Sequence, residues 1–453
     1  MQITVVGLGY VGLVTATCLA RLGQRVTGLE SDVDKVASLE RGEAPYYEPH
    51  LQGELSALQG GDGGLRFTSD PADAFAQPDV VLICVGTPSS ATGEADLRAV
   101  ESVIDSLAEH LAGRTVVALR STVPVGTTRR VEAMLNERLR ERGGPAPVSV
   151  LANPEFLRTG RALDDFLHPS RVVLGRTESA SDDDVETLET LYRPLGAPIF
   201  VLDAESAELV KNASNTYLAA RISFVNELAA LCEATGAAID SVLEAVAADP
   251  RIGSEYFHPG IGYGGSCLPK DVRSMIAMGS ANEVTMTLAR AIDAVNAEQP
   301  VRAAARLDRA IPGGLDGSRV ALLGLAFKAG TDDIRDSPAL ALAGVLRDRG
   351  ATVVACDPQA AAVVATREPW IEIAQGPLDA ARGADAVVLA TDWAEYVTAD
   401  LAPIAARMRG RVLLDARDAL DPARVRAAGL EILSIGRRDE RGAAASGEAV
   451  SPA

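Results

Sequence analysis

Short apolar runs alternate with amphipathic segments along the first part of the chain. QITVVG, RVTGLE, DVVLICVG and TVVALRS have the apolar, β-branched composition of strands. YVGLVTATCLARLG and AVESVIDSLAEHL place apolar residues at helical spacing between them. SVLANPEF and SRVVLG continue the alternation to about residue 176. Near-continuous apolar strands separated by helices predict a parallel sheet covered on both faces.

The pattern changes at Ala204, where apolar residues recur at helical spacing to about Cys232 without Gly or Pro. The spacing predicts one helix longer than the mean, as expected of a spine between domains. Helical patterning extends to about residue 310, IPGGLDG then makes a linker-like break, and βα alternation resumes in SRVALLGLAFK, TVVACDP, ADAVVLAT and RVLLDA. The predicted fold class is therefore α/β, with two doubly wound Rossmann-like domains joined by a long central helix. The predicted ranges are 1–202, 203–310 and 311–436, followed by a small, polar and disordered tail at 437–453.

Charge and composition narrow the possible partners. The 453 residues carry a net charge of −19, which argues against nucleic acid and anionic membranes as partners. An anionic ligand must then be held by local basic groups. The apolar N-terminus lacks the basic region of a signal peptide, and no other run predicts a membrane span, so we expect a cytoplasmic protein. The four histidines are not paired at ligand spacing, and no metal is expected.

The five cysteines are scattered, odd in number and never spaced C-x-x-C, which argues against disulfides and a zinc site. Four of them lie in apolar runs typical of core positions: Cys18, Cys84, Cys232 and Cys356. Cys267 differs, because it ends the glycine-rich segment GIGYGGSC and precedes Lys270 and Asp271. Glycines let the backbone wrap around a ligand, and a cation or a helix N-terminus favours a thiolate. Cys267 is therefore a candidate nucleophile, the alternative being a structural cysteine in a turn.

Gly7-x-Gly9-x-x-Gly12 follows the first strand and opens a helix. In this context Gly7 permits a tight turn, Gly9 lets the backbone approach a pyrophosphate, and Gly12 allows close packing of helix on strand. Glu30 ends the second strand, where a carboxylate accepts from a ribose 2′-OH and repels a 2′-phosphate. The pattern favours NAD over NADP. The alternative is glycines that serve packing alone and a solvated Glu30.

Polar segments follow two further strands of the first domain. Glu155 lies in NPEFLRTG and Thr122 in STVPVGT, each at the carboxyl end of a predicted strand. In α/β proteins that end faces the ligand crevice, although ordinary helix caps would explain either segment alone.

Two further pairs of polar residues are candidate site residues. Lys211 and Asn215 are four apart and share one face of the long helix, where a solvated pair is the alternative. Lys328 and Arg335 follow the first strand of the second βα domain, which lacks the glycine fingerprint, and could hold phosphate groups.

The motifs G-x-G-Y-V-G, C-V-G-T-P, S-T-V-P-V-G-T, N-P-E-F-L-R and G-G-S-C-x-P-K-D occur in this order. Together they resemble the UDP-glucose/GDP-mannose dehydrogenase family, most closely its members that oxidise UDP-glucose, from Met1 to about residue 436. The resemblance implies an N-terminal NAD-binding domain, a central region that forms a homodimer and a C-terminal domain that holds the UDP-sugar. It implies the oxidation of UDP-glucose to UDP-glucuronate with two NAD+, through a thiohemiacetal and a thioester on Cys267. The alternatives are GDP-mannose or an N-acetylated UDP-hexosamine as substrate, a two-electron dehydrogenase, or a silent nucleotide-sugar-binding protein.

The resemblance also implies roles for individual residues. The implied catalytic residues are Cys267, Lys211, Asn215, Asp271, Glu155 and Thr122. The implied cofactor contacts are Gly7, Gly9, Tyr10, Val11, Gly12, Glu30, Lys35, Thr87, Thr122, Thr159, Lys270 and Arg335. The implied substrate contacts are Glu155, Phe156, Leu157, Arg158, Thr159, Lys211, Asn215, Arg251, Tyr256, Phe257, His258, Pro259, Gly260, Gly264, Cys267 and Lys328, with Arg251 reaching the substrate of the neighbouring subunit. The chain departs from the family pattern at Thr159 (usually Glu), at Leu268 (commonly Phe) and at Glu30 (commonly Asp).

Overall fold

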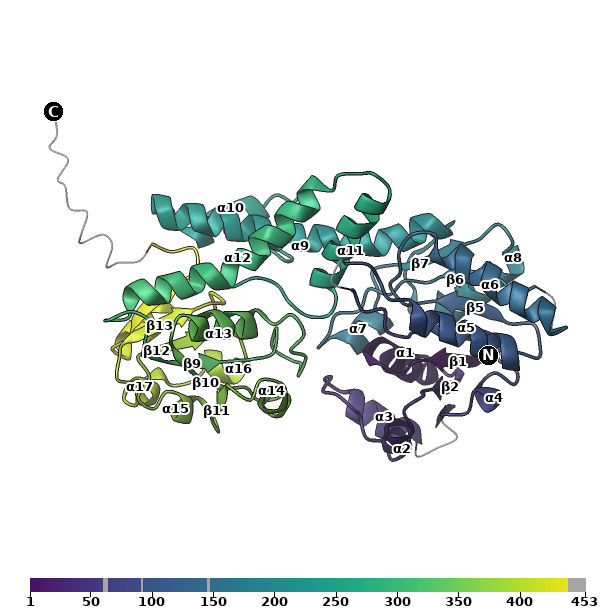
Figure 1. Cartoon of the computed structure of the whole chain (residues 1–453), viewed down its shortest axis with the longest axis horizontal. Helices are drawn as coiled ribbons and strands as arrows, with labels where there is room; N and C mark the ends of the chain where they lie inside the picture. The colour runs from purple at the N-terminus through teal and green to yellow at the C-terminus, as the bar shows by residue number, and fades with distance from the viewer. Residues whose placement is uncertain (60–63, 91–92, 145–146, 439–453) are drawn as a thin grey trace. The chain divides into compact units, whose positions relative to one another are not determined.

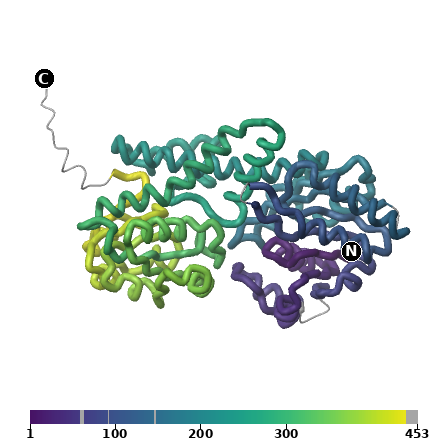
Figure 2. The backbone as a smooth tube through the Cα atoms, viewed as in Figure 1, coloured from purple at the N-terminus to yellow at the C-terminus, as the bar shows by residue number. Residues whose placement is uncertain are grey.

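The structure is a computed structural model that describes residues 1–59, 64–90, 93–144 and 147–438. It divides into two compact units (Figures 1 and 2). Unit 1 consists of residues 1–214 and 273–285, and unit 2 of residues 215–272 and the chain from Met286 onward.

Unit 1 is built on an eight-stranded sheet with the order β3-β2-β1-β4-β5-β6-β7-β8. Its strands are β1 (Gln2–Val6), β2 (Arg25–Leu29), β3 (Leu65–Thr68), β4 (Val80–Ile83), β5 (Val116–Leu119), β6 (Val150–Ala152), β7 (Val172–Arg176) and β8 (Ile199–Asp203). Its helices are α1 (Tyr10–Arg21), α2 (Val33–Glu40), α3 (Leu51–Gln59), α4 (Pro71–Ala74), α5 (Arg98–His110), α6 (Thr127–Glu141), α7 (Ala162–Leu167) and α8 (Asp182–Tyr192). The order reverses between β1 and β4, and ligands of open α/β sheets bind at the carboxyl ends of such strands.

Helices cover both faces of this sheet, which explains why its central strands are apolar at every position. In β4, Val80 and Leu82 pack into one core cluster, whereas Val81 and Ile83 pack into another on the opposite face. Successive side chains of a strand point to opposite faces, so both clusters require apolar residues.

The sheet departs from the predicted parallel arrangement at one pair, because β7 runs antiparallel to β6. The connection between them contains only the six-residue helix α7, which packs against α1. A helix of this length spans about 9 Å and does not carry the chain back across the sheet. The chain therefore re-enters the sheet from the edge at which β6 ended, and β8 is again parallel to β7.

Unit 2 contains a six-stranded sheet with the order β11-β10-β9-β12-β13-β14, in which every pair is parallel. Its strands are β9 (Arg319–Leu323), β10 (Thr352–Cys356), β11 (Glu372–Ile373), β12 (Ala386–Leu389), β13 (Val412–Asp415) and β14 (Glu431–Ser434). Its shorter helices are α13 (Pro338–Asp348), α14 (Ala361–Arg367), α15 (Pro377–Ala380), α16 (Ala394–Val397), α17 (Leu401–Ala405) and α18 (Pro422–Ala427). This is the strand order of a dinucleotide-binding fold, with its switch point between β9 and β12.

Four helices lie between the two sheets in the sequence: α9 (Ala204–Thr235), α10 (Ile239–Ala247), α11 (Leu268–Ala281) and α12 (Thr287–Ala310) (Figure 1). The 32-residue helix α9 is the predicted long central helix, and the predicted fold class is confirmed. The domain boundaries stay a prediction, and residues 439–453 of the predicted tail lie outside the described residues. Within the described ranges, no helix is long and apolar enough to cross a membrane.

Candidate active site

The three glycines of the first motif occupy different environments at the carboxyl end of β1. Gly7 has a φ of +85°, and a Cβ there would lie 2.8 Å from the side chain of Val85. A Cβ at Gly12 would lie only 1.9 Å from the carbonyl oxygen of Gly7, whereas a Cβ at Gly9 would meet no atom within 4 Å. Gly7 and Gly12 are therefore required by the turn itself. Gly9 leaves open space at the N-terminus of α1, as a pyrophosphate requires.

Glu30 follows β2 directly and is held as a carboxylate. Its oxygens accept from the backbone N–H of Leu8 at 3.1 Å and from Lys35 Nζ at 2.9 Å. Burial raises the pKa of Glu30, but the Lys35 ammonium and backbone N–H groups outweigh it and leave the pKa below its ordinary value. Glu30 and Lys35 thus fit a ribose contact at this strand end. Two other predicted cofactor residues are hydrogen-bonded to each other: Thr87 Oγ1 donates to the carbonyl oxygen of Thr122 at 2.7 Å.

Glu155 and Lys211 form a buried ion pair in unit 1. Their side chains are 5 % and 4 % exposed, and Glu155 Oε1 lies 3.1 Å from Lys211 Nζ. Burial raises the pKa of Glu155, but Lys211, the N–H of Leu157 and the more distant Arg120 together lower it below its ordinary value. Lys211 and Thr122 also line one small pocket at the ends of β5 and β6. The structure therefore brings together three of the predicted catalytic residues, with Glu155 ionised.

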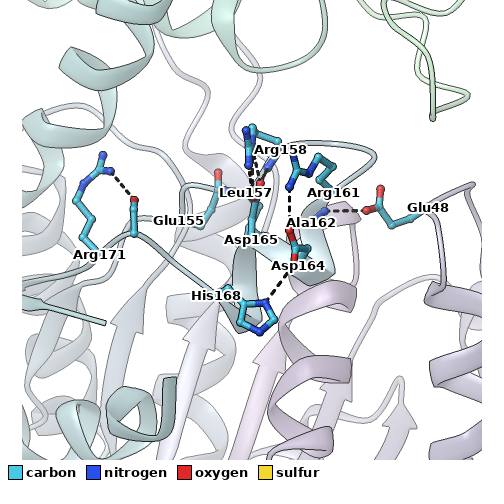
Figure 3. Close-up of polar contacts among 11 residues, drawn as sticks. Glu48, Glu155, Leu157, Arg158, Arg161, Ala162, Asp164, Asp165, His168 and Arg171 are labelled. Carbon is cyan, nitrogen blue, oxygen red and sulfur yellow. Dashed lines mark hydrogen bonds and ion pairs between the residues drawn. The ribbon is translucent and has the colours of Figure 1, made fainter. Parts of the chain in front are cut away.

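Two acids that the sequence did not single out hold the loop after Glu155 (Figure 3). Asp165 accepts from the N–H of Arg158 at 2.8 Å and pairs with its guanidinium at 2.6 Å. Glu48 accepts from the N–H groups of Gly160 at 2.6 Å and Ala162 at 2.8 Å. The predicted contact residue Arg158 is therefore paired within the protein, and the loop backbone around Thr159 is fixed from two sides.

Phe156, another predicted substrate contact, lies close to two cations. The Arg171 guanidinium lies 3.8 Å from its ring centroid and Lys211 Nζ lies 5.5 Å from it. Arg171 also donates to Ser214 at 3.0 Å, and burial lowers the pKa of its guanidinium (Figure 3). Such contacts fix the ring and add positive potential beside the Glu155–Lys211 pair.

In unit 2, Cys267 immediately precedes α11 and is partly exposed, whereas the other four cysteines are buried. Its carbonyl oxygen accepts from the N–H of Asp271 at 2.9 Å, the first hydrogen bond of the helix. The thiol therefore belongs to the residue that caps a helix N-terminus, where positive potential favours a thiolate. Burial has the opposite effect in the core and raises the pKa of Cys18 and Cys84 to about 12. The distinction drawn from the sequence between Cys267 and the four core cysteines is confirmed.

One turn along α11, the carboxylate of Asp271 is fully buried and contacts two other predicted residues. Asn215 Nδ2 donates to Asp271 Oδ2 at 2.6 Å, and Lys270 Nζ donates to Oδ1 at 2.6 Å. Asp271 is therefore oriented by an amide on one oxygen and a cation on the other.

The glycine-rich loop before Cys267 packs directly against the loop after β9. A Cβ at Gly264 would lie 2.2 Å from the carbonyl oxygen of Asp336, and one at Gly265 would lie 2.8 Å from the ring of Phe327. The N–H of Gly265 donates to the carbonyl oxygen of Arg335 at 2.9 Å. Here the glycines serve close backbone approach within the protein. Arg335 itself pairs with Asp333 at 2.7 Å and lies within electrostatic range of Cys267.

Asparagines that were not predicted shape the same loop. Asn226 Oδ1 accepts from the N–H of Gly260 at 2.9 Å, and Asn296 exchanges two hydrogen bonds with the backbone of Tyr263 at 2.7 and 3.0 Å. A neighbouring acid, Asp357 after β10, accepts from the N–H groups of Leu325 and Ala326. In a dinucleotide-binding domain an acid at this strand end is available to a ribose. Here it holds the loop after β9, as Glu30 holds the loop after β1.

The remaining predicted substrate residues have contacts of their own outside these clusters. The Arg251 side chain is 87 % exposed and pairs with Asp249 at 2.5 Å. Phe257 is buried, and the guanidinium carbon of Arg221 lies 5.2 Å from the centroid of its ring. Tyr256 has a φ of +57°. Lys328 Nζ lies 5.7 Å from the centroid of the Phe327 ring. Among the described residues, no group of three or more His, Cys, Asp or Glu side chains could hold a metal ion.

Family profiles match most of this chain. Residues 1–196 match the NAD-binding domain of the UDP-glucose/GDP-mannose dehydrogenase family, residues 205–298 its central domain and residues 321–422 its UDP-binding domain. The chain belongs to this family. The predicted cofactor, NAD, is confirmed by the same match, and the open space at Gly9 with Glu30 at the end of β2 fits it.

Individual members of the family are similar over nearly the whole chain. The UDP-glucose 6-dehydrogenase of Pseudomonas aeruginosa is 41 % identical over 450 residues, covering 96 % of this chain and 98 % of that protein. A solved UDP-glucose dehydrogenase from Pyrobaculum islandicum is 36 % identical, covers 96 % of this chain and 98 % of its own, and superposes with a TM-score of 0.88. A UDP-D-ManNAc dehydrogenase structure from Pyrococcus horikoshii is 30 % identical with a TM-score of 0.84, covering 97 % of this chain and 100 % of its own.

Proposed function

We propose that this chain oxidises UDP-glucose to UDP-glucuronate with two NAD+ and water, releasing two NADH. The observation that carries the proposal is the partly exposed Cys267 at the N-terminus of α11, next to the Lys270–Asp271–Asn215 cluster. Support also comes from the UDP-glucose 6-dehydrogenases that are similar over nearly the full length. NAD+, when bound, accepts a hydride in each of the two oxidations.

The cysteine divides the four-electron oxidation into two steps. Loss of a hydride from C6 and of the hydroxyl proton converts the alcohol to an aldehyde. The Cys267 sulfur then bonds to the aldehyde carbon, and the oxygen takes up a proton to give a thiohemiacetal. A second loss of hydride and proton leaves a thioester, and water cleaves its C–S bond to release the carboxylic acid and the thiol. Covalent capture retains the reactive aldehyde between the two oxidations.

The charged residues of the proposed site suit this sequence of steps. Lys211, held as a cation by the ionised Glu155, stabilises negative charge on the C6 oxygen, and Asn215 helps to hold that oxygen. Asp271 orients or deprotonates water, with Glu155 and Thr122 also acting on the hydrolytic water.

The sugar is tested by incubating the purified chain with NAD+ and, separately, with UDP-glucose, GDP-mannose and UDP-N-acetylmannosamine, while NADH formation is followed by its absorbance. We expect NADH from UDP-glucose. The second candidate, an N-acetylated UDP-hexosamine, is favoured by the similarity to the Pyrococcus enzyme, and NADH from that sugar alone would replace the first proposal.

The role of Cys267 is tested with Cys267→Ala. We expect UDP-glucuronate formation to stop while the affinity for NAD+ stays unchanged, because Cys267 is not among the proposed cofactor contacts and lies outside the part of the chain that matches the NAD-binding domain. Cys232→Ala, which removes a buried thiol from α9 in the same unit, is the matched control and keeps acid formation. Acid formation by Cys267→Ala at the wild-type rate would rule out the thioester route.

We further propose a homodimer formed through the central helix. Tyr217, Phe224 and Leu231 recur every seven residues along α9 and are 64 %, 52 % and 58 % exposed. Side chains at this spacing lie on one helix face, and an exposed apolar stripe marks a protein interface. Phe224→Asp is expected to shift the sedimentation of the chain from dimer to monomer, whereas a change at the exposed Val33 of α2 leaves it unchanged. In this dimer Arg251 would serve the substrate of the neighbouring subunit.

The proposed location is the cytoplasm. All five cysteines are free and the proposed reaction requires a reduced thiol together with NAD+. Cell fractionation followed by detection of the chain tests this, and recovery outside the cytoplasmic fraction would contradict it.

A further inference from the structure

A buried carboxylate, Glu48, joins three segments of unit 1 that are far apart in the sequence. It is 4 % exposed and lies between α2 and α3. Its oxygens accept from the hydroxyl of Tyr10, from the N–H of Gly160 at 2.6 Å and from the N–H of Ala162 at 2.8 Å. None of the catalytic roles proposed above uses this acid.

Burying a charge is costly unless hydrogen bonds compensate for the lost water. Glu48 receives three donors, and hydrogen bonds to an ionised acceptor are about twice as strong as neutral ones. Burial and the adjacent Glu48 raise the pKa of Tyr10, so its hydroxyl keeps the proton that it donates. The same hydroxyl accepts from the N–H of Gly160 at 3.0 Å, which closes a three-membered network.

The loop that this network holds is the one that follows Glu155. Its N–H groups are bound by three carboxylates: Leu157 by Glu155 at 2.5 Å, Arg158 by Asp165 at 2.8 Å, and Gly160 by Glu48 at 2.6 Å. Figure 3 shows the three acids, with Glu48 drawn in its bond to the N–H of Ala162. Glu155 and Asp165 belong to the loop or to the helix that follows it. Glu48 is the member of this set that comes from a distant segment, 112 residues away along the chain.

The other end of the network lies in the cofactor motif. Tyr10 occupies the position after Gly9 and begins α1. The Tyr46 hydroxyl donates to the carbonyl oxygen of Tyr10 at 3.2 Å, and the two rings lie 5.2 Å apart. The segment from Tyr46 to Glu48 is thus anchored on the cofactor motif and reaches the loop from there.

We propose that Glu48 is a positioning residue for nucleotide-sugar binding, which holds the backbone from Arg158 to Ala162 against the anchor provided by Tyr10. Preorganising a binding loop before the ligand arrives lowers the cost of binding. The inference rests on the proposed function only for the identity of the sugar nucleotide.

The test uses Glu48→Gln in the full chain. The amide preserves shape but presents an N–H donor in place of one acceptor oxygen, so it cannot accept from Gly160, Ala162 and Tyr10 together. Three quantities are measured: hydrogen–deuterium exchange of a peptide covering residues 155–163, the KM and kcat for UDP-glucose, and the Kd for NAD+. We expect exchange to become about tenfold faster, KM to rise about tenfold, and kcat and the NAD+ Kd to stay within about threefold, as for loss of one charged hydrogen bond.

Two further variants make the result specific. Tyr10→Phe removes the second anchor. In the double variant with Glu48→Gln, we expect KM to rise by less than the product of the two single-variant factors, because both side chains act through one network. Glu132→Gln is the matched control. Glu132 likewise accepts from a backbone N–H, that of Val150 at 2.9 Å, and from a hydroxyl, but at the opposite end of β6.

Three results in Glu48→Gln would each overturn the positioning role. They are an unchanged exchange rate, faster exchange with an unchanged KM, and a weaker NAD+ affinity as the main effect. The same would follow from an equal rise in KM in Glu132→Gln. Wild-type chain that makes no NADH from UDP-glucose would instead refute the proposed function, and the exchange measurement would still decide whether Glu48 holds the loop.

Discussion

Gly9 and Gly12 belong to one motif but have different surroundings. We therefore expect the same substitution, glycine to alanine, to impair the protein for different reasons at the two positions. Gly9→Ala adds a methyl group that meets no protein atom within 4 Å. Gly12→Ala places the same group 1.9 Å from the carbonyl oxygen of Gly7. The first should therefore impair NAD+ binding with little effect on the fold, whereas the second should destabilise the fold itself.

The magnitudes follow from the local geometry. Gly9 has φ −63° and ψ −172°, a conformation that alanine also adopts, so the smaller entropy of the unfolded chain stabilises Gly9→Ala by about 0.4–1 kcal/mol. Loss of glycine as N-cap of α1 costs a similar amount, and the two effects nearly cancel. Gly12→Ala suffers an overlap with backbone, for which overpacking costs about 1–3 kcal/mol or more. In a unit of this size 1 kcal/mol shifts the Tm by about 2–4 °C.

The assay combines thermal unfolding without ligand and calorimetric titration with NAD+. Gly9→Ala is expected to keep the wild-type Tm within about 3 °C and to lose about 10- to 100-fold in NAD+ affinity, because the methyl group occupies the space that the pyrophosphate requires. Gly12→Ala is expected to lower the Tm by several degrees, about 3–10 °C. Wild-type NAD+ affinity in a folded Gly9→Ala chain would refute this interpretation of the open space.

Three further predictions concern charged groups. Lys211→Met leaves Glu155 buried without its cation and should lower the free energy of unfolding by about 3–5 kcal/mol, which a lower Tm would show. Adding Glu155→Gln should recover most of this loss. A normal Tm in the single variant would contradict the ion pair. The folded chain holds the pKa of Glu155 below the ordinary 4.5, so the stability that this ionised carboxylate contributes is present above that pH and is lost as the pH falls through the lowered pKa. When Tm is measured against pH, we therefore expect it to fall less steeply at acid pH in Glu155→Gln than in the wild type. Glu30→Ser removes the charge that repels a 2′-phosphate and should shift the ratio of NADP+ to NAD+ affinity by about tenfold or more; an unchanged ratio of the two Kd values would show that Glu30 does not select the cofactor.

The apolar pattern was sufficient to predict both doubly wound sheets, because their central strands are buried on both faces and separated by helices of regular period. The reversed direction of β7 was not predictable in the same way. SRVVLG has the composition of a buried strand whichever way it runs. The direction depends on where α7 packs, and the pattern of a six-residue helix carries no such information.

Most of the predicted site residues lie within glycine-rich or strand-end motifs, where spacing alone suggests a ligand. Glu48, Asp165 and Asn296 were missed because their partners lie far away in sequence or in neighbouring loops, and no motif marks them. Glu208 is a further example. It lies in the helical run AESAELVK and looks like a solvated acid, yet it is buried and accepts from the N–H groups of Gly126 and Thr128 at 2.6 Å each. Helix periodicity predicts the face on which such an acid lies, but not the helix N-terminus that it caps.

In the proposed reaction one chain carries out both oxidations of the sugar, and Cys267 retains the aldehyde covalently between them. The most direct test is to add a limiting, known amount of UDP-glucose to excess NAD+ and to count the NADH formed per molecule of UDP-glucuronate released. We expect a ratio of about two NADH per sugar, and no acid from Cys267→Ala, because in the proposed reaction a thioester on the cysteine precedes release of the acid. A ratio of about one, with an aldehyde or ketone as the product, would contradict it.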